Sequence, residues 1–467
     1  MNYTFDPGIL REYDIRGQIG KNLSEEDAHA LGLAFGTYIQ EQGSPIGEHY
    51  TICVGCDGRL SSPSLEKSLC QGLKETGLRV INVGLGPTPM LYFSVKHLNA
   101  DAGIMVTGSH NPSDYNGFKM TLNKAPVFGE EIQKIGRISS SGALKEGEGV
   151  IEDTDIRHAY VDRLIQDLDL NRKLTIAWDA GNGAAGEILE LLTAKIPGTH
   201  HLLFEEIDGN FPNHHPDPTV DENLADLRAL VAKEACDLGI AFDGDGDRIG
   251  AVDEKGEILR CDLLMTLYAR EVLDTHPGAA IIGDVKCSQL MFDEINKMGG
   301  NAVMWKTGHS LIKDKMRELN APLAGELSGH IFFADKYYGY DDALYCAVRL
   351  LNALSGAKGG LSSLTSHLPK LMNTPELRIE VDENEKFDLV PRILEELESA
   401  AADNDTITLD NTDGVRVSTP DGWWLVRPSN TQNVLVARME ANNAQGLERL
   451  KKMADEAFEK IGYSLSA

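Results

Sequence analysis

The 467-residue sequence has few cysteines and few basic residues, and each shortage excludes a class of protein. The seven cysteines are odd in number and spread from Cys53 to Cys346, and the Cys53-x-x-Cys56 pair has no second pair to complete a zinc site. We therefore expect reduced, buried thiols. Lysine and arginine number 44 against 72 acidic residues, and the resulting formal charge of -28 argues against nucleic acid as a partner.

Long apolar runs are also missing. No run approaches the roughly 18 residues that span a bilayer, and Met1 to Leu10 has neither the basic nor the apolar region of a signal peptide. We expect a soluble, cytoplasmic protein with no membrane partner. The apolar content of 42% is typical of globular domains, and the length allows three or four of them.

One pattern recurs three times along the chain. An apolar, strand-like run ends in Asp57, Asp179 and Asp284, and each is followed by a second apolar run that opens into a polar loop. These loops are residues 107–112, 243–248 and 325–330. Three copies of one α/β unit would produce this pattern, and ligands of open α/β sheets bind where such loops leave the carboxyl ends of strands.

The end of the chain follows a different pattern. Apolar and polar residues alternate from 406 to 439, and an amphipathic segment follows from Ala444 to Ile461. This pattern indicates an antiparallel sheet with helices. We therefore predict an α/β fold with three similar mixed-sheet domains in tandem and a C-terminal α+β domain, arranged around one central active-site cleft. The predicted domains are 1–154, 155–256, 257–369 and 370–467.

Three aspartates in the second polar loop indicate a metal site. Asp243, Asp245 and Asp247 alternate with glycines, so their carboxylates can converge on a hard cation such as magnesium or calcium. An EF-hand is the alternative, since Glu254 stands at the twelfth position of such a loop. It is disfavoured because Arg248 replaces the required glycine and the next residues are strand-like rather than helical.

Ser109 is a candidate nucleophile, because it follows a strand-like run and precedes His110. The hydrolase pattern G-x-S-x-G fails, since Asn111 stands at the second glycine. A capping serine beside a structural histidine is the competing interpretation. A magnesium ion held by neighbouring carboxylates usually also takes a phosphate oxygen, and a phosphorylated Ser109 would supply one.

A glycine turn predicts an alternative function. Gly181-x-Gly183-x-x-Gly186 lies between a strand-like run and a helical segment, with Glu205 and Glu206 about twenty residues further on, as in dinucleotide-binding sites. The alternative is therefore an NAD(P)-dependent dehydrogenase. The competing interpretation is a tight turn that serves packing.

Four loops together resemble the signature loops of the α-D-phosphohexomutase family. They are residues 107–112, 243–248, 325–330 and 427–431, and further segments are similar to the bacterial bifunctional phosphomannomutase/phosphoglucomutase branch: 13–17, 114–119, 209–218 and 306–313. The resemblance covers nearly the whole chain. It departs at Leu327, where methionine is commoner, and at Gln432 and Asn433 after the fourth loop.

The resemblance implies an isomerase that interconverts hexose 1-phosphate and hexose 6-phosphate, with mannose, glucose or both as the sugar. A phosphoserine would donate the phosphoryl group, and a hexose 1,6-bisphosphate would be intermediate and activator. Such a transfer depends mainly on positioning and charge neutralisation. The implied catalytic residues are Ser109, His110, Lys119 and Arg16, and the implied Mg²⁺ ligands are Ser109, Asp243, Asp245 and Asp247.

The resemblance also implies a substrate-binding set: Tyr13, Arg248, Lys286, His309, Glu326, Ser328, His330, Arg427, Ser429, Asn430 and Thr431. Within it, Glu326 and Ser328 suit sugar hydroxyls and would serve mannose and glucose alike. The fourth loop combines a guanidinium with hydroxyl and amide donors, which suits the non-reacting phosphate. Because that loop has no catalytic group, we expect the C-terminal domain to act as a mobile lid.

Overall fold

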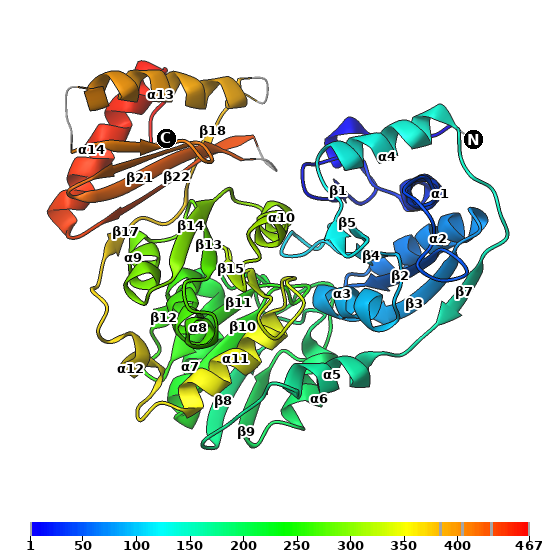
Figure 1. Ribbon diagram of the computed structural model, residues 1–467, viewed down its shortest axis with the longest axis horizontal. Helices are drawn as coiled ribbons and strands as arrows, with labels where there is room; N and C mark the ends of the chain where they lie inside the picture. Colours follow the sequence, from blue (N-terminus) through cyan, green and yellow to red (C-terminus); the bar gives the residue numbers. More distant parts are fainter. Residues whose placement is uncertain (1, 383–384, 403–405, 430–432, 466–467) are drawn as a thin grey trace.

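The structure is a computed structural model that describes residues 2–382, 385–402, 406–429 and 433–465. For residues 399–402 it describes the backbone only. Two predicted substrate residues, Asn430 and Thr431, lie outside the described residues. The strands form four separate sheets that follow one another along the chain (Figure 1). None of the helices in the described ranges is long and apolar enough to cross a membrane.

The first sheet has the strand order β1-β5-β4-β2-β3-β7, with β6 paired to β5. Residues on its two faces pack against different helices, because Ile52 and Val54 join one core cluster while Cys53 joins another. Its elements are β1 (Ile15–Gln18), α1 (Glu25–Glu41), β2 (Thr51–Cys56), α2 (Ser62–Glu75), β3 (Arg79–Leu85), α3 (Thr88–His97), β4 (Ala102–Val106), β5 (Tyr115–Leu122), β6 (Ala125–Pro126), α4 (Glu130–Ser141) and β7 (Val150–Asp153).

The second and third sheets have the orders β12-β11-β10-β8-β9 and β14-β13-β15-β16. The strands of the second sheet and their accompanying helices are α5 (Arg157–Ile165), β8 (Leu174–Asp179), α6 (Gly186–Thr193), β9 (Gly198–Leu203), α7 (Ala225–Glu234), β10 (Leu238–Phe242), β11 (Ile249–Asp253) and β12 (Ile258–Leu259). The strands of the third sheet and their accompanying helices are α8 (Cys261–Thr275), β13 (Ala280–Asp284), α9 (Gln289–Lys297), β14 (Asn301–Trp305), α10 (His309–Leu319), β15 (Leu323–Gly325), β16 (Ile331–Phe333), α11 (Ala343–Ser355) and α12 (Leu361–Thr365).

The threefold repeat predicted from the sequence is confirmed by the strand pairings. In each copy a central strand (β2, β8 or β13) pairs in parallel with two neighbours, and one neighbour pairs antiparallel with the strand that follows it. The three polar loops occupy the same place in each copy, after β4, β10 and β15. Each copy therefore delivers one loop at the carboxyl end of a buried strand.

The fourth sheet is antiparallel throughout and has the order β17-β22-β21-β20-β19, with β18 paired to β22. This confirms the predicted α+β pattern at the end of the chain. The elements are β17 (Met372–Asn373), β18 (Leu377–Glu380), α13 (Lys386–Ala402), β19 (Thr408–Asp410), β20 (Val415–Thr419), β21 (Gly422–Pro428), β22 (Val434–Ala441) and α14 (Ala444–Lys460). Both helices cover one face of this sheet, and the other face points to the third sheet (Figure 1).

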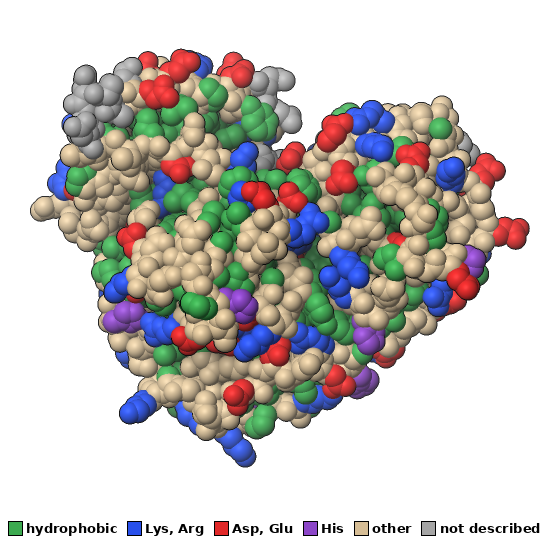
Figure 2. Space-filling view, in the orientation of Figure 1, with side chains coloured by type: hydrophobic (Ala, Val, Ile, Leu, Met, Phe, Trp, Pro, Cys, Tyr) green, Lys and Arg blue, Asp and Glu red, His purple; other side chains and the backbone are tan. Residues whose placement is uncertain are grey.

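Buried polar contacts join the fourth sheet to the third. The Arg416 guanidinium donates to the carbonyl oxygens of Val285, at 2.7 Å, and Cys287, at 2.9 Å. Glu440 Oε1 accepts from Ser288 Oγ and from Trp423 Nε1, both at 2.8 Å. Figure 2 shows an open notch between the C-terminal domain and the N-terminal part. Lid movement across this notch stays a prediction, and it would have to break or carry along these contacts.

The structure also bears on the predicted thiols and on the predicted domain boundaries. All seven cysteines are buried and free, as expected. The domain boundaries stay predictions, and β12 lies just beyond the one at 256 although it pairs with β11 of the second sheet. A two-residue strand carries too little pattern to be assigned to a sheet from its sequence.

The pairing of β1 with β5 depends on a glycine and leads to a testable prediction. Gly117 lies opposite Arg16, and a Cβ at Gly117 would be 2.2 Å from the Ile15 carbonyl oxygen. Gly117→Ala is expected to push β1 away and lower the free energy of unfolding by about 1 to 3 kcal/mol, as measured by chemical denaturation. Gly47→Ala is the control, because a Cβ there meets no atom within 4 Å. Equal stability of the two variants would contradict the prediction.

Candidate active site

Ser109 lies three residues after the end of β4, in the first polar loop. Its side chain is 3% exposed, with Oγ 3.2 Å from His110 Nδ1 and 3.3 Å from Asp243 Oδ2. The backbone of Ser109 has a φ of 51°, a left-handed conformation that costs a residue other than glycine about 1 to 3 kcal/mol. Surrounding contacts must therefore hold this loop in place.

Arg59 and Asp57 hold the loop. Asp57 Oδ2 accepts from the Gly108 amide at 3.0 Å and from Thr107 Oγ1 at 2.8 Å. Arg59 is 1% exposed, and its side chain donates to four carbonyl oxygens of the loop region, those of Ser109, Asn111, Pro112 and Tyr115. Sequence reasoning did not identify Arg59. The available signal was its place two residues after Asp57, the aspartate that ends the first repeated run.

The three aspartates of the second loop converge, as predicted. Asp243, Asp245 and Asp247 are fully buried, and one carboxylate oxygen from each lies within 4.8 Å of the others. Lys119 reaches across from β5, with Nζ 2.8 Å from Asp245 Oδ2 and 2.5 Å from Asp247 Oδ2. The other oxygen of Asp245 is buried without a hydrogen-bond partner. Such an oxygen is available to a cation.

The electrostatics of this cluster fit a metal ion. Burial and repulsion from Asp247 and Asp245 raise the pKa of Asp243 well above its ordinary value. Burial acts in the same direction on Asp247, but Lys119 and His330 outweigh it and hold the pKa of Asp247 well below its ordinary value. Three convergent carboxylates with one unpartnered oxygen form the hard donor set that Mg²⁺ prefers, so these residues fit the predicted ion.

His330 in the third loop connects the second sheet to the third. Its Nδ1 is 3.0 Å from Glu326 Oε2, and its Nε2 is 3.1 Å from Asp247 Oδ1. Burial opposes protonation, but Asp247 and Glu326 together raise the pKa of His330 to about 9. The ring is therefore an imidazolium that donates to both carboxylates. Arg248 Nε lies 3.3 Å from Nε2, but a protonated ring nitrogen cannot accept a hydrogen bond from it.

The fourth sheet reaches the same region through Arg427 at the end of β21. Arg427 Nε donates to Asp413 Oδ2 at 2.8 Å, and the same oxygen accepts from the Thr307 amide at 3.0 Å. The hydroxyl of Tyr13, from the first sheet's side, donates to the Thr307 carbonyl oxygen at 2.9 Å. Contacts among loop residues thus connect all four sheets.

Comparisons with known proteins match this architecture throughout. Models of the phosphoglucomutase/phosphomannomutase family match its alpha/beta/alpha domains I, II and III to residues 8–145, 158–256 and 260–372, and its C-terminal domain to residues 376–457. A phosphomannomutase/phosphoglucomutase of Pseudomonas aeruginosa is 43% identical over 462 residues, covering 99% of this chain and 98% of that protein. The chain belongs to the phosphoglucomutase/phosphomannomutase family.

Other members of the family are similar over comparable lengths. A phosphoglucomutase of Neisseria gonorrhoeae is 41% identical over 95% of each chain. The crystal structure of a phosphoglucomutase/phosphomannomutase family protein from Burkholderia thailandensis covers 99% of each chain, with a TM-score of 0.91 and 41% identity. The family resemblance and the fold predicted from the sequence are therefore confirmed.

The other predicted site residues that the structure describes make the following contacts, and their roles stay proposals. Arg16 donates to the Gly108 carbonyl oxygen at 2.8 Å, and Ser328 Oγ is 3.2 Å from His330 Nδ1. Lys286 Nζ donates to Glu376 Oε2 at 3.3 Å. His309 Nδ1 is 3.6 Å from Asp341 Oδ2. Ser429 is buried beyond Arg427, and its amide donates to the Val434 carbonyl oxygen at 2.9 Å.

The glycine turn of the alternative function packs against the chain itself. A Cβ at Gly186 would lie 1.9 Å from the Glu205 carbonyl oxygen, and one at Gly183 would lie 2.9 Å from the Gly244 carbonyl oxygen. Both positions therefore need a glycine so that the neighbouring backbone can approach closely. The structure thus favours the packing interpretation over a dinucleotide site.

The EF-hand alternative also fails on its geometry. Glu254, at the twelfth position, accepts hydrogen bonds from the Ser362 amide and hydroxyl instead of joining the aspartates. The residues after Arg248 form β11, as the sequence indicated, and not a helix.

Arg59 should be a positioning residue for the Ser109 loop. Arg59→Lys keeps a positive charge beside Asp57 but cannot donate to four carbonyl oxygens, so we expect mutase kcat/KM to fall roughly ten- to hundredfold, about 1.4 to 2.8 kcal/mol. Steady-state kinetics on a hexose phosphate, with circular dichroism to confirm folding, provide the test. Arg79→Lys, in an exposed pair with Glu152, is the matched control. A folded Arg59→Lys enzyme with normal kinetics would rule out this role.

Proposed function

We propose that the protein is a phosphomannomutase/phosphoglucomutase that interconverts the 1-phosphates and 6-phosphates of mannose and glucose. The observation that carries the proposal is the position of Ser109, whose Oγ lies 3.3 Å from Asp243 beside three converging carboxylates. Family membership over almost the whole chain and the names of the relatives in Pseudomonas and Neisseria support the reaction and the sugars.

Ser109 would exchange one phosphoryl group with the sugar in each half-reaction. First, the bond between phosphorus and Ser109 Oγ breaks as the free hydroxyl of a hexose monophosphate forms a new bond to phosphorus. The product is hexose 1,6-bisphosphate. The other phosphate then returns to Ser109 in the reverse sense. A hexose 1,6-bisphosphate would also restore the phosphoserine after its loss, which makes it an activator.

His110 is placed to carry the proton of this exchange, which passes from the sugar hydroxyl to Ser109 Oγ. Its Nδ1 lies 3.2 Å from Oγ. Burial, with a further contribution from Arg248 and Arg16, lowers the pKa of His110 well below its ordinary value. The ring is therefore neutral and able to accept a proton and return it.

Positive charge around the phosphoryl group would come from both the chain and the metal. A Mg²⁺ ion held by Asp243, Asp245, Asp247 and the phosphoserine would neutralise phosphoryl oxygens. Lys119 stands beside the same carboxylates, and Arg16 contacts the residue before Ser109. Because phosphoryl transfer needs little covalent chemistry from the protein, such fixed cations supply most of the stabilisation.

The sugar and its second phosphate would bind opposite Ser109. Glu326 and Ser328 flank His330 and offer a carboxylate and a hydroxyl to the sugar hydroxyls. Lys286, His309, Arg248 and Tyr13 would complete this side. Arg427 and Ser429, together with the undescribed residues of the fourth loop, would bind the non-reacting phosphate, and exclusion of water would protect the phosphoserine.

Phosphorylation of Ser109 is the direct test of the covalent mechanism. After incubation with glucose 1,6-bisphosphate and Mg²⁺, peptide mapping by mass spectrometry should find one phosphoryl group, on Ser109. Ser109→Ala should lack it and lose turnover, while Ser140→Ala, at an exposed position, should behave as wild type. A protein that cannot be phosphorylated, together with an active Ser109→Ala variant, would exclude a phosphoserine.

Arg427 provides a test of phosphate binding that is separate from phosphoserine formation. Arg427→Ala removes a two-pronged, charge-assisted contact worth about 1.5 to 3 kcal/mol, so kcat/KM should fall roughly ten- to hundredfold while Ser109 remains phosphorylated. Kinetics on glucose 1-phosphate and mannose 1-phosphate measure the loss. Arg449→Ala, in an exposed pair with Asp421 of the same domain, is the control. Normal kinetics of Arg427→Ala would remove the phosphate clamp from the proposal.

A further inference from the structure

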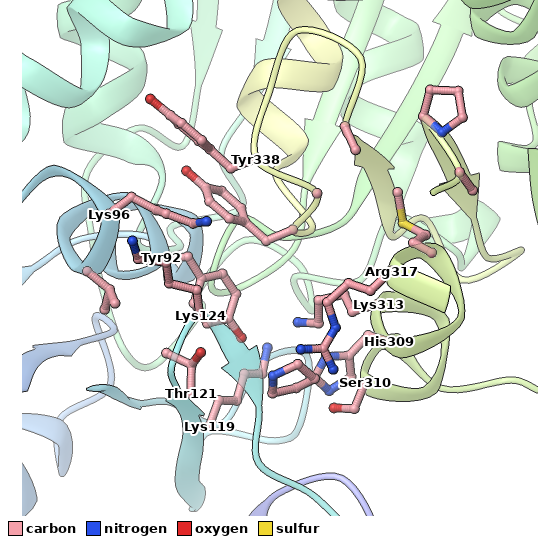
Figure 3. A pocket seen from close by; sticks show the side chains of 18 of the residues that line it. Tyr92, Lys96, Lys119, Thr121, Lys124, His309, Ser310, Lys313, Arg317 and Tyr338 are labelled. Carbon is pink, nitrogen blue, oxygen red and sulfur yellow. The ribbon is translucent and has the colours of Figure 1, made fainter. Parts of the chain in front are cut away.

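A cavity adjoins the candidate active site. It has a volume of about 340 Å³ and opens between α3 and the β5–β6 turn on one side and α10 with residues 334–340 on the other (Figure 3). Its lining includes Tyr13, Lys119 and His309. The lining contains neither Ser109 nor the three aspartates, and no residue of the fourth sheet. The cavity therefore shares three residues with the proposed catalytic and substrate-binding set but contains no residue of the proposed phosphate clamp.

The lining is strongly basic in a chain that is strongly acidic. The described lining includes no aspartate or glutamate. Five lysine and arginine side chains line the cavity: Lys96, Lys119, Lys124, Lys313 and Arg317. The whole chain carries a formal charge of -28. A cavity whose lysine and arginine side chains face no lining carboxylate concentrates positive potential and attracts small anions.

Two of these cations are not neutralised by the protein. Lys119 contacts Asp245 and Asp247, and Lys313 Nζ is 2.9 Å from Asp341 Oδ1. Within the ranges that the structure describes, by contrast, neither Lys96 nor Lys124 forms an ion pair with a carboxylate. Burial lowers the pKa of Lys96, and repulsion from Lys124 lowers it further. An anion between the two ammonium groups would relieve that repulsion.

Helix α10 places two more cations on the same wall. Lys313 and Arg317 are four residues apart, so both side chains lie on one helix face, and like charges at this spacing destabilise a helix. Arg317 forms an ion pair with Asp314, and both side chains are more than half exposed to solvent. In Figure 3, Lys96 and Lys124 lie on one side of the cavity, and Lys313 and Arg317 face them from α10. Both walls thus present cations to the space between them.

Tyrosines and apolar side chains complete the walls. Lys313 Nζ lies 4.7 Å from the Tyr92 ring centroid, and Lys96 Nζ lies 5.9 Å from that of Tyr338. Tyr340 packs against Tyr92 with ring centroids 5.5 Å apart, which fixes this wall. Apolar lining residues include Met120, Met316 and Pro322. Such a surface suits a ligand with a carbon skeleton as well as a charge.

We propose that this cavity is a second anion site, which binds a small phosphate ester of about the size of a hexose monophosphate. The volume lies within the range of about 300 to 1,000 Å³ that is usual for small-molecule pockets. The phosphate would lie among Lys96, Lys124 and Arg317 near the opening, and the carbon skeleton would lie along the tyrosines. A ligand here would also contact Lys119 and His309, so its binding would be felt at the catalytic centre. The site does not depend on turnover at Ser109.

Lysine labelling followed by peptide mapping tests the site directly. The full-length protein is acetylated briefly with and without glucose 6-phosphate, at ionic strength matched with sodium chloride. The ligand should slow acetylation of Lys96 and Lys124 at least threefold. Protection of both lysines should follow the same saturation curve as the concentration of glucose 6-phosphate rises. The exposed Lys21 and Lys67 are internal controls and should be unaffected. Unchanged labelling of Lys96 and Lys124, or equal slowing at the controls, would overturn the proposal.

Further ligands and variants identify what is bound and where. Inorganic phosphate should protect the same lysines only at higher concentration, and glucose should not protect them. Equal potency of phosphate and ester would contradict binding of the carbon skeleton. Arg317→Gln should raise the half-protecting concentration of glucose 6-phosphate about tenfold, whereas Arg427→Ala should leave it unchanged. A shift in Arg427→Ala alone would place the ligand in the proposed catalytic site and overturn the second site, whatever the outcome for mutase activity.

Discussion

A line of buried charge pairs positions the candidate active site. It runs from Lys119 on β5 to Asp247 in the second sheet's loop, then through His330 to Glu326 in the third. Glu326 continues it by accepting from the Gly308 amide at 2.7 Å. Removing one partner of a buried pair costs about 3 to 5 kcal/mol, so these contacts fix three sheets relative to one another. The strained Ser109 turn is placed against this line.

The threefold repeat explains why one centre can be assembled from such distant segments. Each copy has an aspartate at or directly after the end of its central strand, and two of these carboxylates support the neighbouring loop. Asp57 accepts from the Gly108 amide, and Asp284 accepts from the Leu327 amide at 3.3 Å. The same local structure thus presents Ser109 in one copy and the loop with Glu326 and His330 in another. The fourth sheet has a different topology and contributes Arg427 through Asp413.

The repeat, the metal loop and Ser109 could be predicted because their signals are local: apolar runs, glycine spacing and alternating aspartates. The function of Arg59 could not, since its carbonyl partners lie about fifty residues away and no pattern connects them. The protonation of His330 depends on two carboxylates from different sheets. The glycine turn at 181–186 shows the converse, because a local pattern typical of dinucleotide sites here serves packing against Glu205. The role of this turn is decided by the residue it packs against, Glu205, which lies outside the glycine motif.

The buried cluster brings the carboxylates of Asp243, Asp245, Asp247 and Glu326 together with the cations Lys119, Arg248 and His330. Burial and repulsion from Asp247 and Asp245 raise the pKa of Asp243, and a divalent ion at the unpartnered oxygen of Asp245 would offset that repulsion. Titration calorimetry with Mg²⁺ tests this account most directly. We expect one ion per wild-type chain and at least tenfold weaker binding to Asp245→Asn. No binding to the wild-type protein, or equal affinity in the variant, would contradict it.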